Sequence, residues 1–398
     1  MNDREYMLRA IELAKRGEGW VNPNPLVGAV IVKDGRIIGE GWHRKYGELH
    51  AERDALAALT EPADGATIYV TLEPCCHYGK QPPCTLAIIE HGISRVVIGS
   101  RDPNPKVAGG GVRALRERGI TVEEDFMREE CDKLNQAFFH YITTGTPYVK
   151  MKYAMTADGK IATRTGTSKW ISGEASRARV HRWRNACMGI MAGIGTVLAD
   201  DPLLNCRIPG GKDPVRIICD TNLRIPEDSQ ICRTAGQYET IVVCGVVTEG
   251  RGPDTVLVVT EGRGPDTVLT KAQRLRQMGI TVWNLPDENS PGNKVSLKKL
   301  MKELGSRKID SVLLEGGGTL NESAPREGIV QEVSVFVAPK IFGGQAKTPV
   351  EGQGVAFPSE ALQMEMISTE AVGEDLLITY RVKDPGKPGE EDICLQES

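Results

Sequence analysis

The pattern of apolar and polar positions predicts a first domain in which helices cover a mixed sheet. Apolar side chains recur at helical spacing over residues 3–16, which indicates an amphipathic helix. An apolar run over 26–32 leads into Asp34-Gly35, a strong hairpin signal, and so predicts two paired strands. A hairpin followed by alternating strands and helices is typical of a sheet with helices packed against it. Further strands are expected at 66–72, 95–99 and 120–122, and further helices from His50 and over 112–119.

The same kind of pattern predicts a second α/β domain after residues 143–147, a stretch that we interpret as a linker. A strand is expected at 148–156 and an arginine-rich helix at 174–185. The glycine run at 316–318 lies between a strand and a helix, where backbone N–H groups can approach a phosphate, although a tight turn explains it equally well. The later strands are expected at 188–194, 215–220, 240–244, 280–283, 310–315, 330–337 and 375–382.

Composition restricts the possible functions. The chain has 398 residues, of which 40% are hydrophobic and 26% charged, and its net charge is −4. This balance argues against a surface that binds nucleic acid by electrostatic attraction. No apolar run approaches the roughly 18 residues needed to span a bilayer, and the N-terminus has no signal-peptide pattern, so we expect no membrane partner and a cytoplasmic location. The 10 cysteines follow no disulfide-like framework.

Three residues of the first domain have the chemistry of a zinc site. His50, Cys75 and Cys84 can hold one Zn²⁺ and leave its fourth position open for water. Glu52 can face the same pocket without ligating the metal and can carry protons. Cys84 follows two prolines, which suit the first turn of a helix, and a helix N-terminus favours a thiolate. A closed structural site, with a fourth ligand from Cys76 or His77, remains the alternative.

The motif His50-Ala51-Glu52, with Pro74-Cys75 and a later cysteine, resembles the zinc deaminases of the cytidine deaminase superfamily. The longer stretch 73–80 is similar to the deaminase half of the bifunctional deaminase–reductases of riboflavin biosynthesis. The resemblance implies a cytidine-deaminase-like three-layer domain over residues 1–146, with zinc on the three ligands and Glu52 as the catalytic residue. The residues that it implies for the pyrimidine and its ribose phosphate are Asn24, His43, His77 and Lys80.

Asp102 is a further candidate for a substrate contact. The sequence Asp102-Pro103-Asn104-Pro105 is a rigid turn just beyond a predicted strand. Open sheets bind ligands at the carboxyl ends of their strands, so an acidic side chain at this position is suitably placed.

The second half resembles the dihydrofolate-reductase-like reductase domain of the same bifunctional enzymes, which gives an α/β domain over residues 147–383. The resemblance rests on the stretches 158–162, 168–171, 193–196, 200–204 and 315–318. It implies an NADPH site lined by Ala154, Trp170, Thr196, Asp200, Gly317, Gly318 and Thr319. It implies a substrate site formed by Ser168, Arg184, Leu204, Arg207 and Glu315. Arginine binds phosphate well because its planar group can donate two parallel hydrogen bonds, and we expect this of Arg184 and Arg207.

Three stretches depart from the family pattern. Residues 248–257 recur as 260–269, which we interpret as a duplicated surface-loop segment. Pro325 falls where a helix is expected, and it would be tolerated in the first turn if Ser323 were the N-cap. Glu322 brings a negative charge close to the expected cofactor phosphates. The tail, residues 384–398, is expected to be disordered.

The resemblance predicts a bifunctional enzyme that needs Zn²⁺ and NADPH. It would deaminate 2,5-diamino-6-(5-phosphoribosylamino)pyrimidin-4-one by hydrolysis and then reduce the ribosyl group to a ribityl chain. The partners expected are this small-molecule substrate and further copies of the chain in a homo-oligomer, with no nucleic acid. Two alternatives remain at this point: a nucleic-acid-editing deaminase with an accessory domain, and a non-catalytic nucleotide-binding protein.

Overall fold

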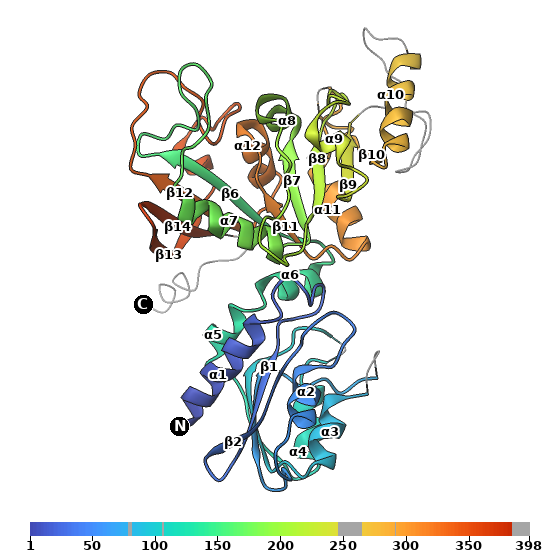
Figure 1. Ribbon diagram of the computed structural model, residues 1–398, viewed down its shortest axis with the longest axis vertical. Coiled ribbons are helices and arrows are strands. Elements are labelled where there is room, and N and C mark those ends of the chain that lie inside the picture. The colour runs from blue at the N-terminus through green and yellow to red at the C-terminus, as the bar shows by residue number, and fades with distance from the viewer. Residues whose placement is uncertain (79–81, 106, 246–264, 291, 384–398) are drawn as a thin grey trace, which may run out of the picture. The chain divides into compact units, whose positions relative to one another are not determined.

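The computed structural model describes residues 1–398 apart from 79–81, 106, 246–264, 291 and 384–398, and apart from the side chains of 265–270 (Figure 1). The described chain forms two compact units. One comprises Met1–Tyr148 with Leu304–Asp310, and the other comprises Val149–Glu303 with Ser311–Ser398. No helix among the described residues is both long enough and apolar enough to cross a membrane.

The first unit is built on a five-stranded sheet with the order β2-β1-β3-β4-β5. Strand β1 pairs antiparallel with β2 and β3, whereas β3, β4 and β5 run parallel. The strands are β1 (Gly28–Lys33), β2 (Arg36–Trp42), β3 (Thr67–Leu72), β4 (Arg95–Ser100) and β5 (Thr121–Glu123). The helices are α1 (Asp3–Lys15), α2 (Ala51–Ala57), α3 (Cys84–Glu90), α4 (Gly110–Arg116), α5 (Arg128–Asp132) and α6 (Gln136–Thr144).

The two faces of this sheet are covered by different helices, as the alternation of side chains along β1 makes clear. Ala29 and Ile31 belong to a buried cluster that includes side chains of α2, α3 and α4. Val30 and Val32 belong to a second cluster formed with α1 and Cys131 of α5. Because successive side chains of a strand point to opposite faces, the unit has three layers, and the predicted fold class is confirmed (Figure 1).

Helix α2 lies unusually close to the sheet because β2 carries a glycine. A Cβ atom on Gly41 would collide with the backbone nitrogen of Ala55 and the carbonyl oxygen of Ala51. Only glycine permits such a close approach of two backbones. The contact fixes the depth of α2, which begins directly after His50.

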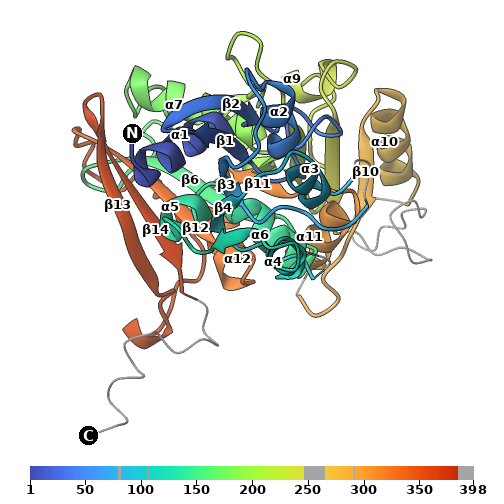
Figure 2. The ribbon, with the colours of Figure 1, turned by 90° about the horizontal axis from the view of Figure 1, so that it is seen from below.

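The second unit contains a nine-stranded sheet with the order β10-β9-β8-β7-β11-β6-β12-β14-β13. Strands β7 to β11 pair in parallel, and β6 is parallel to β12. Strand β14 is antiparallel to β12 and to β13, and β13 and β14 lie side by side in Figure 2. The strands are β6 (Tyr148–Thr156), β7 (Gly189–Gly193), β8 (Val215–Cys219), β9 (Thr240–Cys244), β10 (Thr281–Asn284), β11 (Ser311–Leu314), β12 (Glu332–Ala338), β13 (Met364–Val372) and β14 (Asp375–Val382). The helices are α7 (Glu174–Ala186), α8 (Ile194–Asp200), α9 (Gln230–Arg233), α10 (Pro265–Gln277), α11 (Leu297–Ser306) and α12 (Gly318–Arg326), with a 3₁₀ turn at Pro358–Glu360.

Several elements differ from the sequence-based expectation, and helices α5, α9 and α11 were not predicted. Helix α8 follows β7 at once, where only a strand end was predicted. Strand β13 was missed because its residues are exposed up to Val372, so it has no buried face to give an alternating pattern. The linker prediction was wrong for residues 143 and 144, because they complete α6 and the helix ends at Gly145 in the left-handed conformation.

The prediction for Pro325 was also wrong. Helix α12 begins after Gly317 as the N-cap, so Ser323 is inside the helix and Pro325 lies in its last turn. A proline close to a helix end removes one backbone hydrogen bond without interrupting further turns. The charge of Glu322 is balanced by an ion pair with Arg326 on the next turn.

The duplicated segment is described only in part. Residues 265–269, the end of its second copy, lie in α10, so the prediction of a loop was wrong for them. The rest of the second copy, the whole first copy, and the tail 384–398 are outside the described residues.

Candidate active sites

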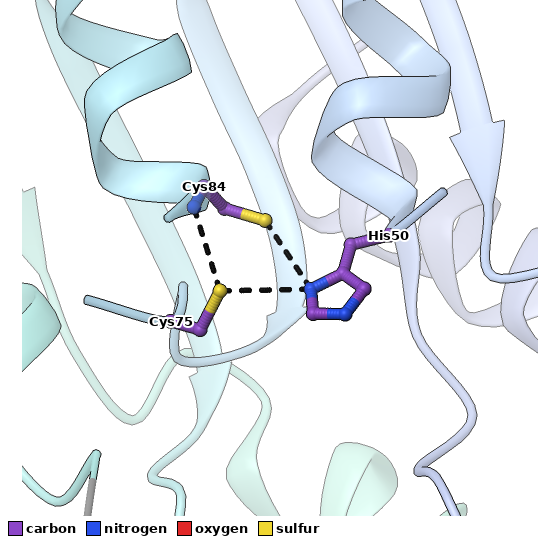
Figure 3. A group of neighbouring side chains, drawn as sticks. All are labelled: His50, Cys75 and Cys84. Carbon is purple, nitrogen blue, oxygen red and sulfur yellow. Dashed lines mark hydrogen bonds between the residues drawn. The ribbon is translucent and has the colours of Figure 1, made fainter. Parts of the chain in front are cut away.

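The structure brings together the three donors that the sequence proposed for a metal (Figure 3). The Nδ1 atom of His50 is 3.5 Å from the Sγ atom of Cys75 and 3.4 Å from that of Cys84. Tetrahedral zinc, with bonds of about 2.3 Å to sulfur and about 2.0–2.1 Å to nitrogen, separates these atoms by roughly 3.5 Å. The donor set and its spacing therefore fit one zinc ion.

The three donors come from the starts of two helices and the end of one strand. His50 is the N-cap of α2, Cys84 is the first residue of α3, and Cys75 follows β3. Arg53, on α2, donates from Nε and Nη2 to the carbonyl oxygens of Pro82 and Pro83, both at 3.1 Å. This arginine fastens the segment that leads to Cys84 onto the helix that follows His50.

Hydrogen bonds prepare one of the two sulfurs as a thiolate. The pKa of Cys75 is lowered to about 4 by three hydrogen bonds, which come from the Cys84 side chain, from His50 and from the backbone N–H of Cys84. The shared hydrogen bond with Cys75, together with burial, raises the pKa of Cys84. Because metal ligands must be deprotonated, zinc binding would displace the proton of Cys84.

Glu52 is buried beside this group, with a side chain that is 3% exposed. Its Oε2 atom has no hydrogen-bond partner among the described residues. Burial and the neighbouring Cys75 raise its pKa to about 7. A carboxyl group that is close to half-protonated at neutral pH is suited to accept and return a proton.

Neither of the two candidates for a fourth ligand joins the described donor group, which contains only His50, Cys75 and Cys84. Cys76 is partly exposed, and burial raises its pKa. His77 has a buried Nδ1 atom without a partner in the described part of the chain. Among the described residues, a metal on these three donors would keep its fourth position open, as in catalytic zinc centres.

The residues proposed to hold the pyrimidine are distributed around this group. The imidazole of His43 lies 5.6 Å from that of His50, centroid to centroid, in an edge-on arrangement. The Nδ1–H of His43 donates to the carbonyl oxygen of Leu49 at 2.8 Å, so its Nε2 accepts from Asn24 Nδ2 at 3.1 Å. Burial lowers the pKa of His43 and so keeps the ring neutral.

Two further predicted residues have different outcomes. Asp102 is buried, accepts a hydrogen bond from the backbone N–H of Asn104 at 2.8 Å, and has its pKa raised to about 6 by burial. Its electrostatic interaction with Cys75 places it near the same group. Lys80 lies outside the described residues.

The second unit has its own charged cluster, centred on Glu315 directly after β11. Arg184 donates from Nε and Nη2 to the two carboxylate oxygens, at 2.7 and 3.1 Å, and Lys152 Nζ lies 3.6 Å from one of them. Burial raises the pKa of Glu315, but the two cations outweigh burial and hold it at about 2. The group is an ion triad whose side chains are each 12–16% exposed.

The sequence analysis missed Lys152 and His181. Lys152 lies in β6 with a side chain that is 16% exposed, and a lysine in a strand with a buried face was the available signal. His181, one turn before Arg184 on α7, has a buried Nδ1 atom without a partner among the described residues. Burial and the charge of Arg184 lower its pKa.

Arg184 does not have the freedom that the sequence suggested. Its Nε and Nη2 atoms donate to the carboxylate of Glu315, and its Nη1 atom donates to the carbonyl oxygen of Asn205 at 3.0 Å. Arg207, by contrast, is exposed and has one weak contact, from Nε to Asn205 Oδ1 at 3.4 Å. Of Arg184 and Arg207, therefore, it is Arg207 whose guanidinium group can donate two hydrogen bonds to a phosphate in this conformation.

The remaining predicted residues gather near the ends of neighbouring strands. Ala154 is near the end of β6, Thr196 is in α8 after β7, and Gly317 precedes α12 after β11. These strands are adjacent in the sheet, and β7 and β11 are parallel, so their carboxyl ends meet at one edge. Gly318 and Thr319 form the first turn of α12.

The other predicted side chains form contacts within the loops of this unit. Ser168 donates to Asp200 at 2.9 Å, and Arg177 lies over the ring of Trp170, which is 61% exposed. Leu204 is buried and has a positive φ of 52°, in the stretch that leads to Arg207.

Comparison with known proteins agrees with both halves of the chain. Residues 1–100 match the family model of the cytidine and deoxycytidylate deaminase zinc-binding region, and residues 147–378 match that of the RibD C-terminal domain. The riboflavin biosynthesis protein RibD of Actinobacillus pleuropneumoniae is 50% identical over 386 residues, covering 97% of this chain and 96% of that protein. RibD of Bacillus amyloliquefaciens is 40% identical, with coverages of 97% and 98%.

Solved structures give the same result. A structure of Acinetobacter baumannii RibD matches with a TM-score of 0.80 at 35% identity, covering 96% of this chain and 99% of that one. A deaminase/reductase from Thermotoga maritima matches with a TM-score of 0.79 at 37% identity, with coverages of 95% and 98%. The chain belongs to the RibD family of bifunctional riboflavin-biosynthesis deaminase–reductases, whose cofactors are Zn²⁺ and NADPH.

Proposed function

We propose that this enzyme deaminates 2,5-diamino-6-(5-phosphoribosylamino)pyrimidin-4-one at the His50–Cys75–Cys84 site and reduces the product with NADPH in the second unit. The observation that carries the proposal is the three-donor group with the buried carboxylate of Glu52 beside it, whose Oε2 atom has no hydrogen-bond partner among the described residues. The Thermotoga maritima relative is described as a deaminase and reductase for such phosphoribosylamino compounds. The match to a reductase family model over 147–378 favours this function over nucleic-acid editing.

In the deaminase site, the chain positions the substrate and moves protons. Zinc held by the three donors would lower the pKa of a water molecule towards neutrality. Glu52 accepts a proton from the attacking water and returns it to the departing amino group, which its pKa of about 7 permits in both directions. Asn24, His43, His77, Lys80 and Asp102 are the residues that we propose for holding the pyrimidine and its ribose phosphate.

In the reductase site, NADPH supplies the hydride for the ribosyl carbon, and the protein supplies orientation. Free N–H groups at the start of a helix attract phosphate, so Gly317, Gly318 and Thr319 at the start of α12 suit the cofactor. Ala154, Trp170, Thr196 and Asp200 complete the proposed cofactor site. We propose that Ser168, Leu204 and Arg207 bind the substrate, and that the ion pair of Arg184 and Glu315 lines the same site.

Other properties of the chain remain proposals. We place the domain boundary between residues 146 and 147, and the enzyme in the cytoplasm without nucleic-acid or membrane partners. A homo-oligomer is supported by β13, the last strand of its sheet, whose Met366 is 61% exposed. Apolar side chains on an edge strand favour pairing with another chain.

The function is tested by resolving the two products. Wild-type enzyme incubated with the pyrimidine substrate should give only the deaminated compound without NADPH, and the reduced compound with it.

Glu52→Gln should lower the deamination rate by about 10²–10⁴-fold, because it removes the proton carrier. The same variant should reduce supplied deaminated intermediate at the wild-type rate, with Glu48→Gln, an exposed glutamate nearby, as the control. Near wild-type deamination by Glu52→Gln would refute its role.

Zinc retention distinguishes the three proposed ligands from their neighbours. Cys84→Ser should reduce the zinc content of the purified protein sharply, because the site loses one of its two thiolates. Cys76→Ser should keep about one zinc per chain, because Cys76 lies outside the donor group. Metal analysis of both variants is the measurement. Undiminished zinc in Cys84→Ser, or its loss in Cys76→Ser, would mean that the ligand set is different.

Arg207→Ala should raise the reductase KM for the phosphorylated substrate. A charge-assisted contact contributes about 1.5–3 kcal/mol, which corresponds to roughly ten- to a hundredfold in affinity. The KM for NADPH should stay nearly constant, and the preference for phosphorylated over dephosphorylated substrate should disappear. Arg224→Ala, which removes another exposed arginine, is the control. If Arg207→Ala keeps the wild-type preference for phosphate, the phosphate contact lies elsewhere.

A further inference from the structure

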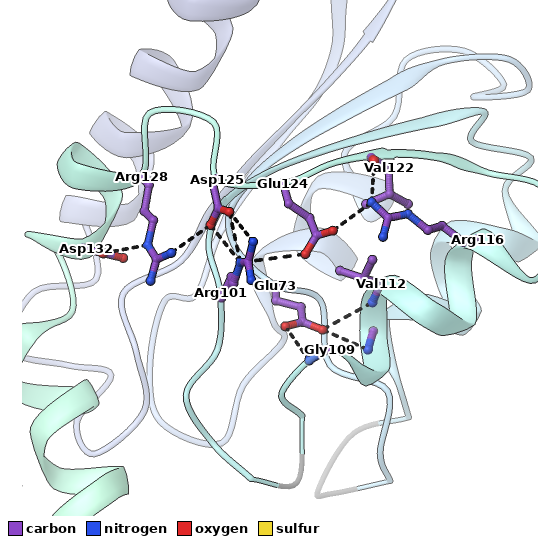
Figure 4. A network of polar contacts seen from close by, with 11 residues as sticks. Glu73, Arg101, Gly109, Val112, Arg116, Val122, Glu124, Asp125, Arg128 and Asp132 are labelled. Carbon is purple, nitrogen blue, oxygen red and sulfur yellow. Dashed lines mark hydrogen bonds and ion pairs between the residues drawn. The ribbon is translucent and has the colours of Figure 1, made fainter. Parts of the chain in front are cut away.

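Glu73, two residues before the proposed ligand Cys75, has a buried carboxylate that binds only backbone amides among its described hydrogen-bond donors. Its side chain is 5% exposed. Its Oε2 accepts from the N–H of Gly109 at 3.1 Å, and its Oε1 accepts from those of Gly111 and Val112 at 3.0 and 3.3 Å (Figure 4). A carboxylate that accepts several amide hydrogen bonds forms a strong, charge-assisted contact.

The same residue also holds the end of strand β4. The backbone N–H of Glu73 donates to the carbonyl oxygen of Ser100 at 3.0 Å. Residues 101–108, of which all but 106 are described, lead from β4 to the start of α4. The backbone N–H of Glu73 binds the residue before this connection, and its side chain binds the amides that follow it. The connection carries Asp102, the proposed substrate contact.

Close backbone packing supports this arrangement independently. A Cβ atom on Gly111 would collide with the carbonyl oxygen of Pro74, and one on Gly110 would lie 2.7 Å from the Sγ atom of Cys76. The start of α4 therefore lies directly against the segment that carries Cys75. The two glycines permit the approach, and the carboxylate of Glu73 holds the approaching amides in place.

We propose that Glu73 is a positioning residue of the deaminase site, which fixes the 101–108 connection so that Asp102 reaches the substrate. This inference rests on the deaminase function proposed above. Glu73 is not one of the three grouped donors His50, Cys75 and Cys84. Its replacement should therefore change substrate binding and keep the zinc content. A residue with a merely structural role would affect unfolding and leave the kinetic constants alone.

The test is Glu73→Gln, which keeps the shape of the side chain. It replaces one acceptor oxygen by an NH₂ group, which cannot accept a hydrogen bond from the backbone N–H that it faces. The deaminase KM should rise about tenfold, the change that corresponds to ~1.4 kcal/mol. Zinc content and reductase rate should match those of the wild type. Glu117→Gln is the control, because that exposed carboxylate lies at the C-terminal end of α4, away from the 101–108 connection. It should leave the deaminase KM unchanged.

A double-mutant cycle with Asp102→Asn tests whether Glu73 affects substrate binding through Asp102. If Glu73 acts through Asp102, Glu73→Gln should have little further effect on KM in the Asp102→Asn background, whereas independent effects would multiply. A wild-type KM in Glu73→Gln, a loss of zinc in proportion to activity, or fully multiplying effects would each overturn the proposal. An inactive wild-type enzyme would instead overturn the proposed function. If Glu73→Gln fails to fold, Glu73→Asp, which retains the charge, provides the same kinetic comparison.

Discussion

The deaminase half depends on holding two sulfur atoms and one imidazole nitrogen within hydrogen-bond distance of one another. The hydrogen bonds among these groups lower the pKa of Cys75 and raise that of Cys84. The fold imposes the spacing by placing His50 and Cys84 at the starts of two helices that pack on one face of the sheet. Since the spacing matches the donor separation of tetrahedral zinc, little rearrangement is needed for metal to bind.

The second unit relies on a different electrostatic principle. A carboxylate as buried as that of Glu315 would be costly to ionise alone, and the two cations beside it compensate. The ion triad restricts Arg184 to one orientation and leaves Arg207 exposed on the neighbouring loop. We therefore propose that Arg207 binds the phosphate of the substrate and that Arg184, held by Glu315, lines the site.

Much of the fold was predictable because many of its strands are short apolar runs, as in β3 and β9. The metal donors were predictable because histidine, glutamate and cysteine in that spacing have a specific chemistry. The elements that were missed give weaker local signals. Strand β13 is exposed along most of its length, and α8 begins within a Gly-Ile-Gly sequence that indicates a turn. The contacts of Lys152 and Glu73 join residues far apart in the chain, and no local pattern encodes such a pairing.

The central claim is that one zinc ion is held by two sulfurs and one nitrogen from the protein, with one position open. X-ray absorption of the zinc-loaded enzyme measures this ligand set directly. The account predicts two sulfur ligands at about 2.3 Å and two lighter ligands at about 2.0–2.1 Å, of which one is the His50 imidazole and the other exchanges with solvent. Three sulfur ligands, which would bring in Cys76, or a second imidazole from His77 would contradict the open site.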